Sequence, residues 1–160
     1  MAGKIPYMAK AGFWAIESQS IRFGRDGRWY SDGEEIANPR IALLFSQHIE
    51  RADDGTWQLV IGDERARIFI DDTPYVVRRV DGAPGSGFTI ELNDGSREDL
   101  PTSNLRISEE NVLYCPVKEG AFEARFLRPA QAELLGHITE ENGDLVLPLP
   151  GGRSVRLAAA

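Results

Sequence analysis

Three acidic pairs, Asp53-Asp54, Asp71-Asp72 and Glu140-Glu141, could supply acid and base groups or hold a divalent cation. The first and last stand beside glycine turns, which favours a role in turn formation and solubility. Asp72 stands between two expected strands, where a carboxylate can cap backbone donors and leave the ring of Tyr75 at the rim of a cleft. We therefore treat Asp72 and Tyr75 as candidate ligand-binding residues, with backbone capping as the alternative role of Asp72.

Arginines close to this element could bind an anionic ligand. Arg78 and Arg79 follow Tyr75 on an extended segment. Since side chains alternate along a strand, only one of the two can face the same pocket as Tyr75, and we select Arg78. The alternative is cross-strand ion pairing at the surface, which contributes little to stability. The preceding hairpin carries the other charged residues that either role would involve, Asp63, Glu64, Arg65 and Arg67.

The two histidines and the single cysteine do not indicate a catalytic or metal site. His48 and His137 fall on or beside the apolar faces of expected helices, where hydrogen bonding near the core is favoured over a pair of titratable imidazoles across an interface. One cysteine, Cys115, and two histidines cannot complete the usual zinc site of four thiolates and imidazoles, and one cysteine cannot form an internal disulfide. We expect no metal site.

The glycine-rich stretch 82–87 matches no catalytic or cofactor-binding motif. Gly85-Ser86-Gly87 lacks the outer residues of a nucleophile elbow, and no phosphate-loop or dinucleotide fingerprint accompanies it. We therefore expect no cofactor and no catalytic residues. A small hydrolase or transferase that uses Asp71, Asp72 and a histidine is the weakest hypothesis, because these groups would have to converge within hydrogen-bond reach.

Composition and charge exclude several classes of protein. The 18 Lys and Arg oppose 25 Asp and Glu, which gives a net charge of -7 and a pI near 4.9, so we expect no nucleic-acid binding. The segment 1–20 lacks the pattern of a secretory leader, and the longest aliphatic and aromatic run, 41–45, is far shorter than the ~20 residues that cross a bilayer. We therefore expect a cytoplasmic protein that does not bind membranes.

Short elements should position the candidate residues. Alternating patterns and Asp-Gly pairs predict short antiparallel strands between residues 21 and 30, and Asn38-Pro39 predicts the start of a helix whose apolar stripe continues to Ile49. Pro129 opens a second helix in the same way, and Pro116 indicates a sheet edge or a bulge. The remaining expected strands lie at 56–61, 66–70, 75–80, 88–92, 105–107, 112–117, 121–127, 145–147 and 155–157.

One pattern occurs twice along the chain. The segments around His48 and His137 share a leading proline, a His-Ile pair, and a following acidic glycine turn and strand pair, at an offset of about 87 to 90 residues. We infer two related hairpin-helix-hairpin units of an α+β fold with mostly antiparallel sheet. The expected domains are a lead segment at 1–19 and units at 20–80 and 81–160, with a cleft between the two units.

Six short motifs between Asp26 and Leu157 carry a family resemblance. They are Gly27-Arg28-Trp29-Tyr30, Leu44-Phe45-Ser46, Asp54-Gly55, the turn at Glu64, Asp72-Thr73-Pro74-Tyr75 and the strand segment 119–126. Together they resemble the bacterial DUF1285 family of uncharacterised proteins. Two departures stand out: Ile61-Gly62-Asp63 replaces a Thr-Pro before Glu64, and Asn38 stands where the family has an arginine near the start of the helix.

The resemblance implies a duplicated α+β fold whose second half is superficially like a pleckstrin-homology barrel. It also implies a small-ligand site, for a nucleotide-like molecule, between the halves, and a role in signal transduction. The positions that it carries over as candidate cleft residues are Trp29, Glu64, Asp72, Pro74 and Tyr75. The two departures imply that this chain binds a different ligand, or none, if the replaced arginine and threonine hold the ligand in the family.

Two binding hypotheses follow for the function. The first is a non-catalytic ligand-binding or sensor protein for a nucleotide-like or anionic molecule, in which Trp29 and Tyr75 form apolar walls and Arg78 binds the anion. In that site Glu64 and Asp72 accept hydrogen bonds or cap the backbone. The second is an interaction adaptor whose curved sheet docks a peptide or strand of a protein partner, which an unpaired sheet edge would favour.

Overall fold

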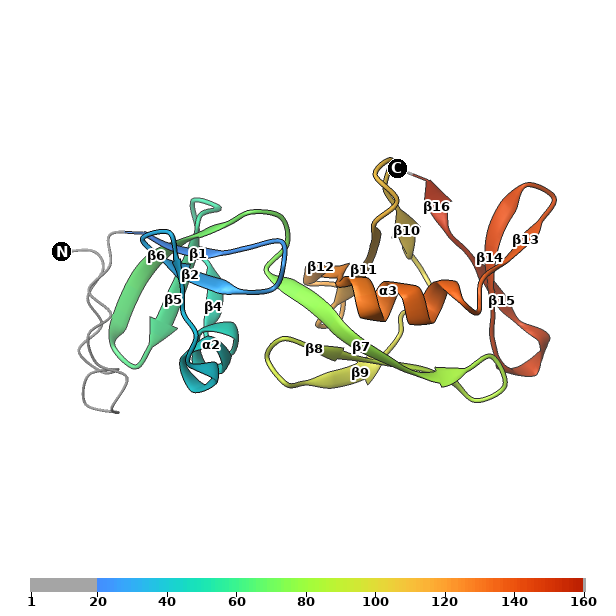
Figure 1. Cartoon of the computed structure of the whole chain (residues 1–160), viewed down its shortest axis with the longest axis horizontal. Coiled ribbons are helices and arrows are strands. Elements are labelled where there is room, and N and C mark those ends of the chain that lie inside the picture. Colours follow the sequence, from blue (N-terminus) through green and yellow to red (C-terminus); the bar gives the residue numbers. More distant parts are fainter. Residues whose placement is uncertain (1–19, 160) are drawn as a thin grey trace. The chain divides into compact units, whose positions relative to one another are not determined.

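The computed structural model describes residues 20–159 and divides the chain into two compact units between Pro74 and Tyr75 (Figure 1). The predicted lead segment at 1–19 lies outside the described residues. The sequence predicts the boundary between the two units between Val80 and Asp81. The division falls earlier because the strand that begins at Tyr75 pairs with two strands of the second unit. The predicted α+β class with mostly antiparallel sheet is confirmed, since three of the strand pairings are parallel and the others antiparallel.

Within residues 20–74, the first unit contains one helix and one six-stranded sheet of order β3-β2-β1-β6-β5-β4. Of the pairings described in this sheet, only β1–β6 is parallel. The helix follows β3 and precedes β4, as the hairpin-helix-hairpin pattern predicts. The elements are β1 (Ile21–Phe23), β2 (Trp29–Ser31), β3 (Glu34–Glu35), α2 (Pro39–Ser46), β4 (Ile49–Arg51), β5 (Trp57–Ile61) and β6 (Glu64–Ile70).

Local signals in the sequence explain where these elements begin and turn. The side chain of Asn38 accepts a hydrogen bond from the backbone N–H of Arg40, and Pro39 occupies the first helical position, where its missing N–H is not needed. The β2–β3 hairpin turns at Asp32 and Gly33, whose φ angles are 49° and 88°. Two positive φ angles define the type I′ turn that suits the twist of a hairpin.

Trp29 lies at the centre of the core of the first unit. Its side chain is only 1% exposed, and its ring centroid lies 4.8 Å from that of Phe23 and 5.4 Å from that of Phe45. Its indole N–H donates a 3.0 Å hydrogen bond to Ser46 Oγ at the end of α2. This bond ties the helix to β2 and satisfies a buried donor.

The second unit contains a seven-stranded sheet of order β16-β10-β11-β12-β7-β8-β9 and a three-stranded sheet β13-β14-β15. Helix α3 lies between β12 and β13 in the chain and packs against β7 (Figure 1). No helix of the described chain, α3 included, has the length and apolar character that spanning a bilayer requires. The elements are β7 (Tyr75–Ala83), β8 (Gly87–Leu92), β9 (Arg97–Asp99), β10 (Arg106–Ile107), β11 (Leu113–Val117), β12 (Phe122–Phe126), α3 (Arg128–Leu135), β13 (Thr139–Glu141), β14 (Asp144–Pro148), η1 (Pro150–Gly152), β15 (Ser154–Arg156) and β16 (Ala158–Ala159).

Part of the second unit repeats the connectivity of the first. The path β10-β11-β12-α3-β13-β14-β15-β16 follows the order of pairings of β1-β2-β3-α2-β4-β5-β6, with β15 and β16 together in the place of β6. β15 pairs with β14 as β6 does with β5, and β16 pairs in parallel with β10 as β6 does with β1. The meander β7-β8-β9 is additional and joins the sheet through β12. That the two units are related copies, and that the second resembles a pleckstrin-homology barrel, stay predictions.

We expect Ser46→Ala to destabilise the first unit by about 1–3 kcal/mol, because it leaves the buried indole N–H of Trp29 without its acceptor. Urea denaturation followed by tryptophan fluorescence measures this, since all three tryptophans precede Tyr75. Ser154→Ala, at an exposed position of β15, is the control and should change stability by less than about 0.5 kcal/mol. Equal midpoints for Ser46→Ala and the wild type would contradict the role given to this hydrogen bond.

Candidate functional site

The residues predicted from the first unit occupy different environments. Trp29 is in the core, enclosed by protein side chains, rather than at a surface. Glu64 is half-buried at the start of β6, where it pairs with Ile61 across the β5–β6 hairpin. Asp72 is exposed in the segment after β6, and Pro74 is buried two residues later. The structure therefore does not gather these four residues into one pocket of the first unit.

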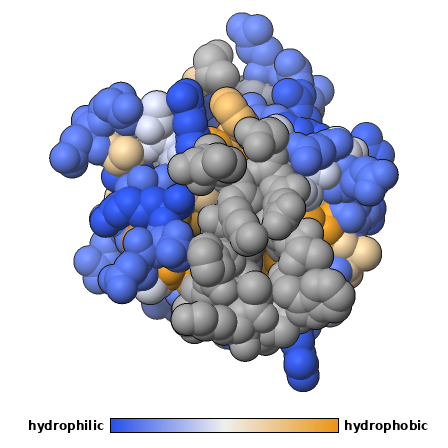
Figure 2. Space-filling model, turned by 90° about the vertical axis from the view of Figure 1, so that its left-hand side faces the viewer, coloured by the Kyte–Doolittle hydropathy of each residue, from blue (hydrophilic) through white to orange (hydrophobic). Residues whose placement is uncertain are grey.

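The outer side of the first sheet carries charged and aromatic side chains. Arg22 stacks over the ring of Tyr30 at 4.4 Å and forms an ion pair with Asp71, while Arg67 lies 5.5 Å from the ring centroid of Phe69. Figure 2 shows mostly hydrophilic side chains among the described residues visible at this end of the chain. Asp71, a candidate acid or base group in the sequence, is therefore an ion-pair partner of Arg22 in the structure.

The histidines make structural contacts. Nδ1 of His48 lies 2.7 Å from the carbonyl oxygen of Leu44, one turn earlier on α2. The ring of His137 packs against Phe88 with the centroids 5.2 Å apart. No group of three or more His, Cys, Asp or Glu side chains between residues 20 and 159 is arranged to hold a metal ion.

Arg78 lies at a β-bulge in β7. The register with β8 shifts between Val77 and Arg79, so Arg78 has no partner residue in the ladder. As a result both Arg78 and Arg79 are exposed, and the alternation predicted for this pair is wrong at this point. Nη2 of Arg79 lies 3.5 Å from Oδ1 of Asp81. The bulge therefore presents Arg78 to solvent as its outward-facing cation.

The second unit contains an open pocket of about 830 Å³ at one end of its larger sheet. The pocket lies where β9 and the loop after it face the hairpin that joins β11 to β12. Its lining residues are Glu98, Asp99, Pro101, Ser103, Asn104, Pro116, Lys118, Glu119 and Gly120.

A proline explains why the sheet opens at this place. The β10–β11 ladder pairs Arg106 with Tyr114 and Ile107 with Leu113, and the same register would bring Asn104 opposite Pro116. Hydrogen bonding between Ser108 and Val112 shows that even-numbered residues of this segment direct their backbone groups towards β10. Pro116 has no N–H to donate there, so the ladder ends and both residues line the pocket instead.

The hairpin on the other side of the pocket has an unusual backbone. Lys118, Glu119 and Gly120 have successive φ angles of 56°, 58° and 84°. The left-handed region is uncommon for residues other than glycine, so contacts with the surrounding chain must hold Lys118 in place.

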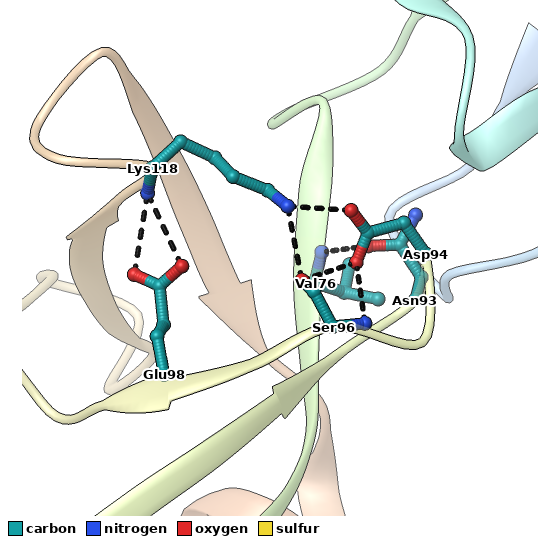
Figure 3. Close-up of polar contacts among 6 residues, drawn as sticks. All are labelled: Val76, Asn93, Asp94, Ser96, Glu98 and Lys118. Atoms are coloured by element: carbon teal, nitrogen blue, oxygen red, sulfur yellow. Dashed lines mark hydrogen bonds and ion pairs between the residues drawn. The ribbon is translucent and has the colours of Figure 1, made fainter.

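Lys118 makes such contacts through its side-chain ammonium group and through its backbone N–H (Figure 3). Its Nζ lies 2.6 Å from Asp94 Oδ2 and 2.9 Å from Ser96 Oγ, in the turn between β8 and β9. Its backbone N–H donates to Glu98, at 3.2 Å and 3.4 Å from the two carboxylate oxygens. Lys118 therefore clasps the β11–β12 hairpin to β9 and to the turn before it.

The same turn holds the first residues of the second unit. The buried side chain of Asn93 accepts a 2.9 Å hydrogen bond from the backbone N–H of Val76 (Figure 3). The ring of Tyr75 lies 5.2 Å from Lys118 Nζ and packs edge-on against Phe122. Tyr75 is thus the predicted site residue that the structure brings to the Lys118 clasp.

The ionisation of the clasp follows from burial and hydrogen bonding. Burial alone would raise the pKa of Asp94, but the hydrogen bonds from Lys118 and Ser96 outweigh it and lower that pKa below 3.8. Burial, together with the negative charges of Asp94 and Glu98, raises the pKa of Tyr75 above 10. At neutral pH Asp94 is therefore a carboxylate and Tyr75 a neutral phenol.

Glu98 stands out among the pocket residues. It pairs across the ladder with the fully buried Ile90, so its side chain is on the inner face of the sheet, where it is half-buried. Within residues 20–159 it has no cationic side-chain partner, because the nearby ammonium group of Lys118 goes to Asp94. A half-buried carboxylate bound by one backbone N–H is a natural anchor for a positively charged group.

Sequence reasoning missed Lys118, Glu98 and Asp94. The segments Lys118-Glu119-Gly120 and Asn93-Asp94-Gly95 were recognisable as turns, but their side chains meet across more than twenty residues of chain. No local signal encodes that pairing. Tyr75 was predicted as a site residue from the segment 72–75, but the neighbours observed for it are Lys118 and Phe122 rather than the predicted ones.

Comparisons with known proteins identify the fold. No protein-family model matches the chain, and no curated protein matches it. A solved structure of a DUF1285 family protein from Silicibacter pomeroyi DSS-3 has a TM-score of 0.68 and 23% identity, over 88% of this chain and 80% of that one. A DUF1285 family protein from Shewanella baltica OS155 has a TM-score of 0.57 and 17% identity, over 72% of this chain and 90% of that one. The resemblance to the DUF1285 family is therefore confirmed in the fold.

Acid should remove the stabilisation that Asp94 provides. A carboxylate whose pKa is lowered in the folded state contributes fully above its ordinary pKa of 3.8, and the contribution is lost as the pH falls below that value. We expect Asp94→Asn to lower the free energy of unfolding by about 1.5–3 kcal/mol at pH 7 and by much less at pH 3. Urea denaturation followed by circular dichroism measures the difference.

Asp144→Asn is the matched control for this experiment, because Asp144 forms an exposed ion pair with Arg156 at 2.7 Å. Such a surface pair should contribute no more than about 1 kcal/mol at pH 7. A deficit of Asp94→Asn that is the same at both pH values would contradict the charged clasp.

Cys115 should be unreactive in the folded protein. Its side chain is fully buried, and burial, with the nearby charges of Glu98 and Glu123, raises the pKa of the thiol to about 12. Since the thiolate is the reactive form, we expect iodoacetamide at pH 8 to label Cys115 only after denaturation. Mass spectrometry with and without urea tests this, and rapid labelling of the native protein would show that the core of the second unit opens readily.

Proposed function

We propose that this protein is a non-catalytic ligand-binding or sensor protein whose site is the pocket of the second unit. The observation that carries the proposal is Glu98, a half-buried carboxylate that lines a pocket of about 830 Å³ and has no cationic side-chain partner among the described residues. The volume is within the range of about 300–1,000 Å³ typical of small-molecule sites.

The charges at the pocket favour a particular class of ligand. Three acidic residues, Glu98, Asp99 and Glu119, line the pocket, whereas the lining cation, Lys118, is already bound to Asp94 and Ser96. An amine, a guanidinium or another N–H donor fits this arrangement better than a phosphate does. The nucleotide-like or anionic ligand suggested by the sequence would require a different site, with Arg78 as its cation, and stays a prediction.

The state of Lys118 favours binding over catalysis. A lysine used as a base or nucleophile needs a free amine, and the ammonium group of Lys118 is instead held by a carboxylate at 2.6 Å and a hydroxyl at 2.9 Å. Lys118 is therefore a positioning residue, which keeps the hairpin wall of the pocket next to Glu98.

A thermal-shift screen of amines, guanidinium compounds, nucleotides and simple anions tests this function. A ligand that binds only the folded state at 100 times its Kd stabilises it by about 2.7 kcal/mol, which is a readily measured rise in Tm. We expect the rise with a cationic compound, and we expect Glu98→Gln to reduce its affinity about 10- to 100-fold. Glu133→Gln, at an exposed position of α3, is the control and should bind as the wild type does.

Three results would contradict the proposal. One is a screen in which no compound raises Tm. Another is an unaltered affinity in Glu98→Gln. The third is a response confined to anions that depends on Arg78 or Asp72, which would support the site predicted from the sequence instead.

A further inference from the structure

The pocket adjoins an unpaired edge of the larger sheet. Strand β9 is the last strand of this sheet, and among the described strands it pairs only with β8. The backbone hydrogen bonds from Leu92 to Ser96, at 2.9 Å, and from Leu100 to Phe88, at 3.0 Å, fix which residues of β9 face β8. These are the even-numbered ones, because hydrogen-bonded and non-hydrogen-bonded pairs alternate in an antiparallel ladder.

The backbone N–H and C=O groups of Arg97 and Asp99 consequently point away from β8. No backbone group in the described part of the chain pairs with them. Asp99 also lines the pocket, so the free edge and the pocket form one continuous surface. The facing wall consists of Pro116 and the Lys118–Gly120 hairpin.

We propose that the natural ligand of this site is an extended peptide segment that adds to β9 as a further strand and places a lysine or arginine side chain in the pocket. This inference rests on the proposed function and names the class of its ligand. The peptide backbone would exchange hydrogen bonds with Asp99, and its cationic group would approach Glu98 and Glu119. Strand addition of this kind obtains affinity from the main chain and specificity from a side-chain pocket.

Charge complementarity selects this occupant. The edge strand is short and bears charged side chains, features that discourage pairing with uncharged strands. The carboxylates beside it repel an acidic segment and attract a basic one, so that the same charges give both attraction and exclusion.

Fluorescence anisotropy with three labelled pentapeptides tests the proposal. The first has the sequence Thr-Val-Lys-Val-Thr with blocked ends. In the second, norleucine replaces lysine and removes the charge. In the third, the lysine is kept but the two valine nitrogens are methylated, which removes backbone donors. We expect the first peptide to bind at least about tenfold more tightly than either of the others.

Two variants of Asp99 separate backbone pairing from charge. Because the N–H of Asp99 points away from β8, Asp99→Pro removes an edge donor without breaking the ladder, whereas Asp99→Asn keeps the donor and removes only the charge. We expect Asp99→Pro to weaken peptide binding at least about fivefold more than Asp99→Asn does, and both variants to bind lysine amide equally. Circular dichroism and Tm confirm that both variants fold.

The outcomes distinguish this inference from the function on which it rests. If lysine amide binds as tightly as the peptide, or if the methylated or norleucine peptide binds as well as the first, the peptide proposal is overturned and ligand binding stands. If neither peptides nor amines bind, both are overturned. If Asp99→Pro and Asp99→Asn lose peptide affinity equally, strand addition is wrong.

Discussion

The ion pair between Lys118 and Asp94 is the interaction on which the candidate site depends. It joins two turns that are far apart in the chain, and the backbone of the same lysine donates to Glu98. A mostly buried pair of this kind is stable only when its remaining donors and acceptors are satisfied, which Ser96 achieves for both partners. Because the ammonium group is used in this way, the half-buried Glu98 has no cationic side-chain partner among the described residues.

The pocket itself results from constraints on the backbone. Pro116 ends the β10–β11 ladder because it cannot donate opposite Asn104, and the left-handed residues at 118 to 120 turn the chain back into β12. The clasp then holds this turn against β9. The missing N–H of Pro116 thus opens the pocket, and Lys118 holds the two walls of the pocket together.

Local elements were predictable from the sequence, and long-range contacts were not. Asn38-Pro39 starts α2 as predicted, because a cap and a proline act within one turn of helix. Trp29 illustrates the limit: its motif was recognised, but a sequence does not show that Phe23 and Phe45 enclose its ring. The bulge at Arg78 and the strand that carries the unit boundary depend on pairing with β8 and β12, which only the folded chain specifies.

The repeated connectivity gives the candidate site a distinctive position. The path from β10 to β16 has a counterpart in the first unit, but the meander β7-β8-β9 has none among residues 20–74. Glu98, Asp99 and the turn that receives Lys118 all belong to this additional meander. The part of the second unit that extends the shared topology is therefore also the part that supplies the anchor carboxylate and the free edge. The other wall of the pocket, Pro116 and the Lys118–Gly120 hairpin, belongs to the repeated path, so the pocket forms where the added strands meet that path.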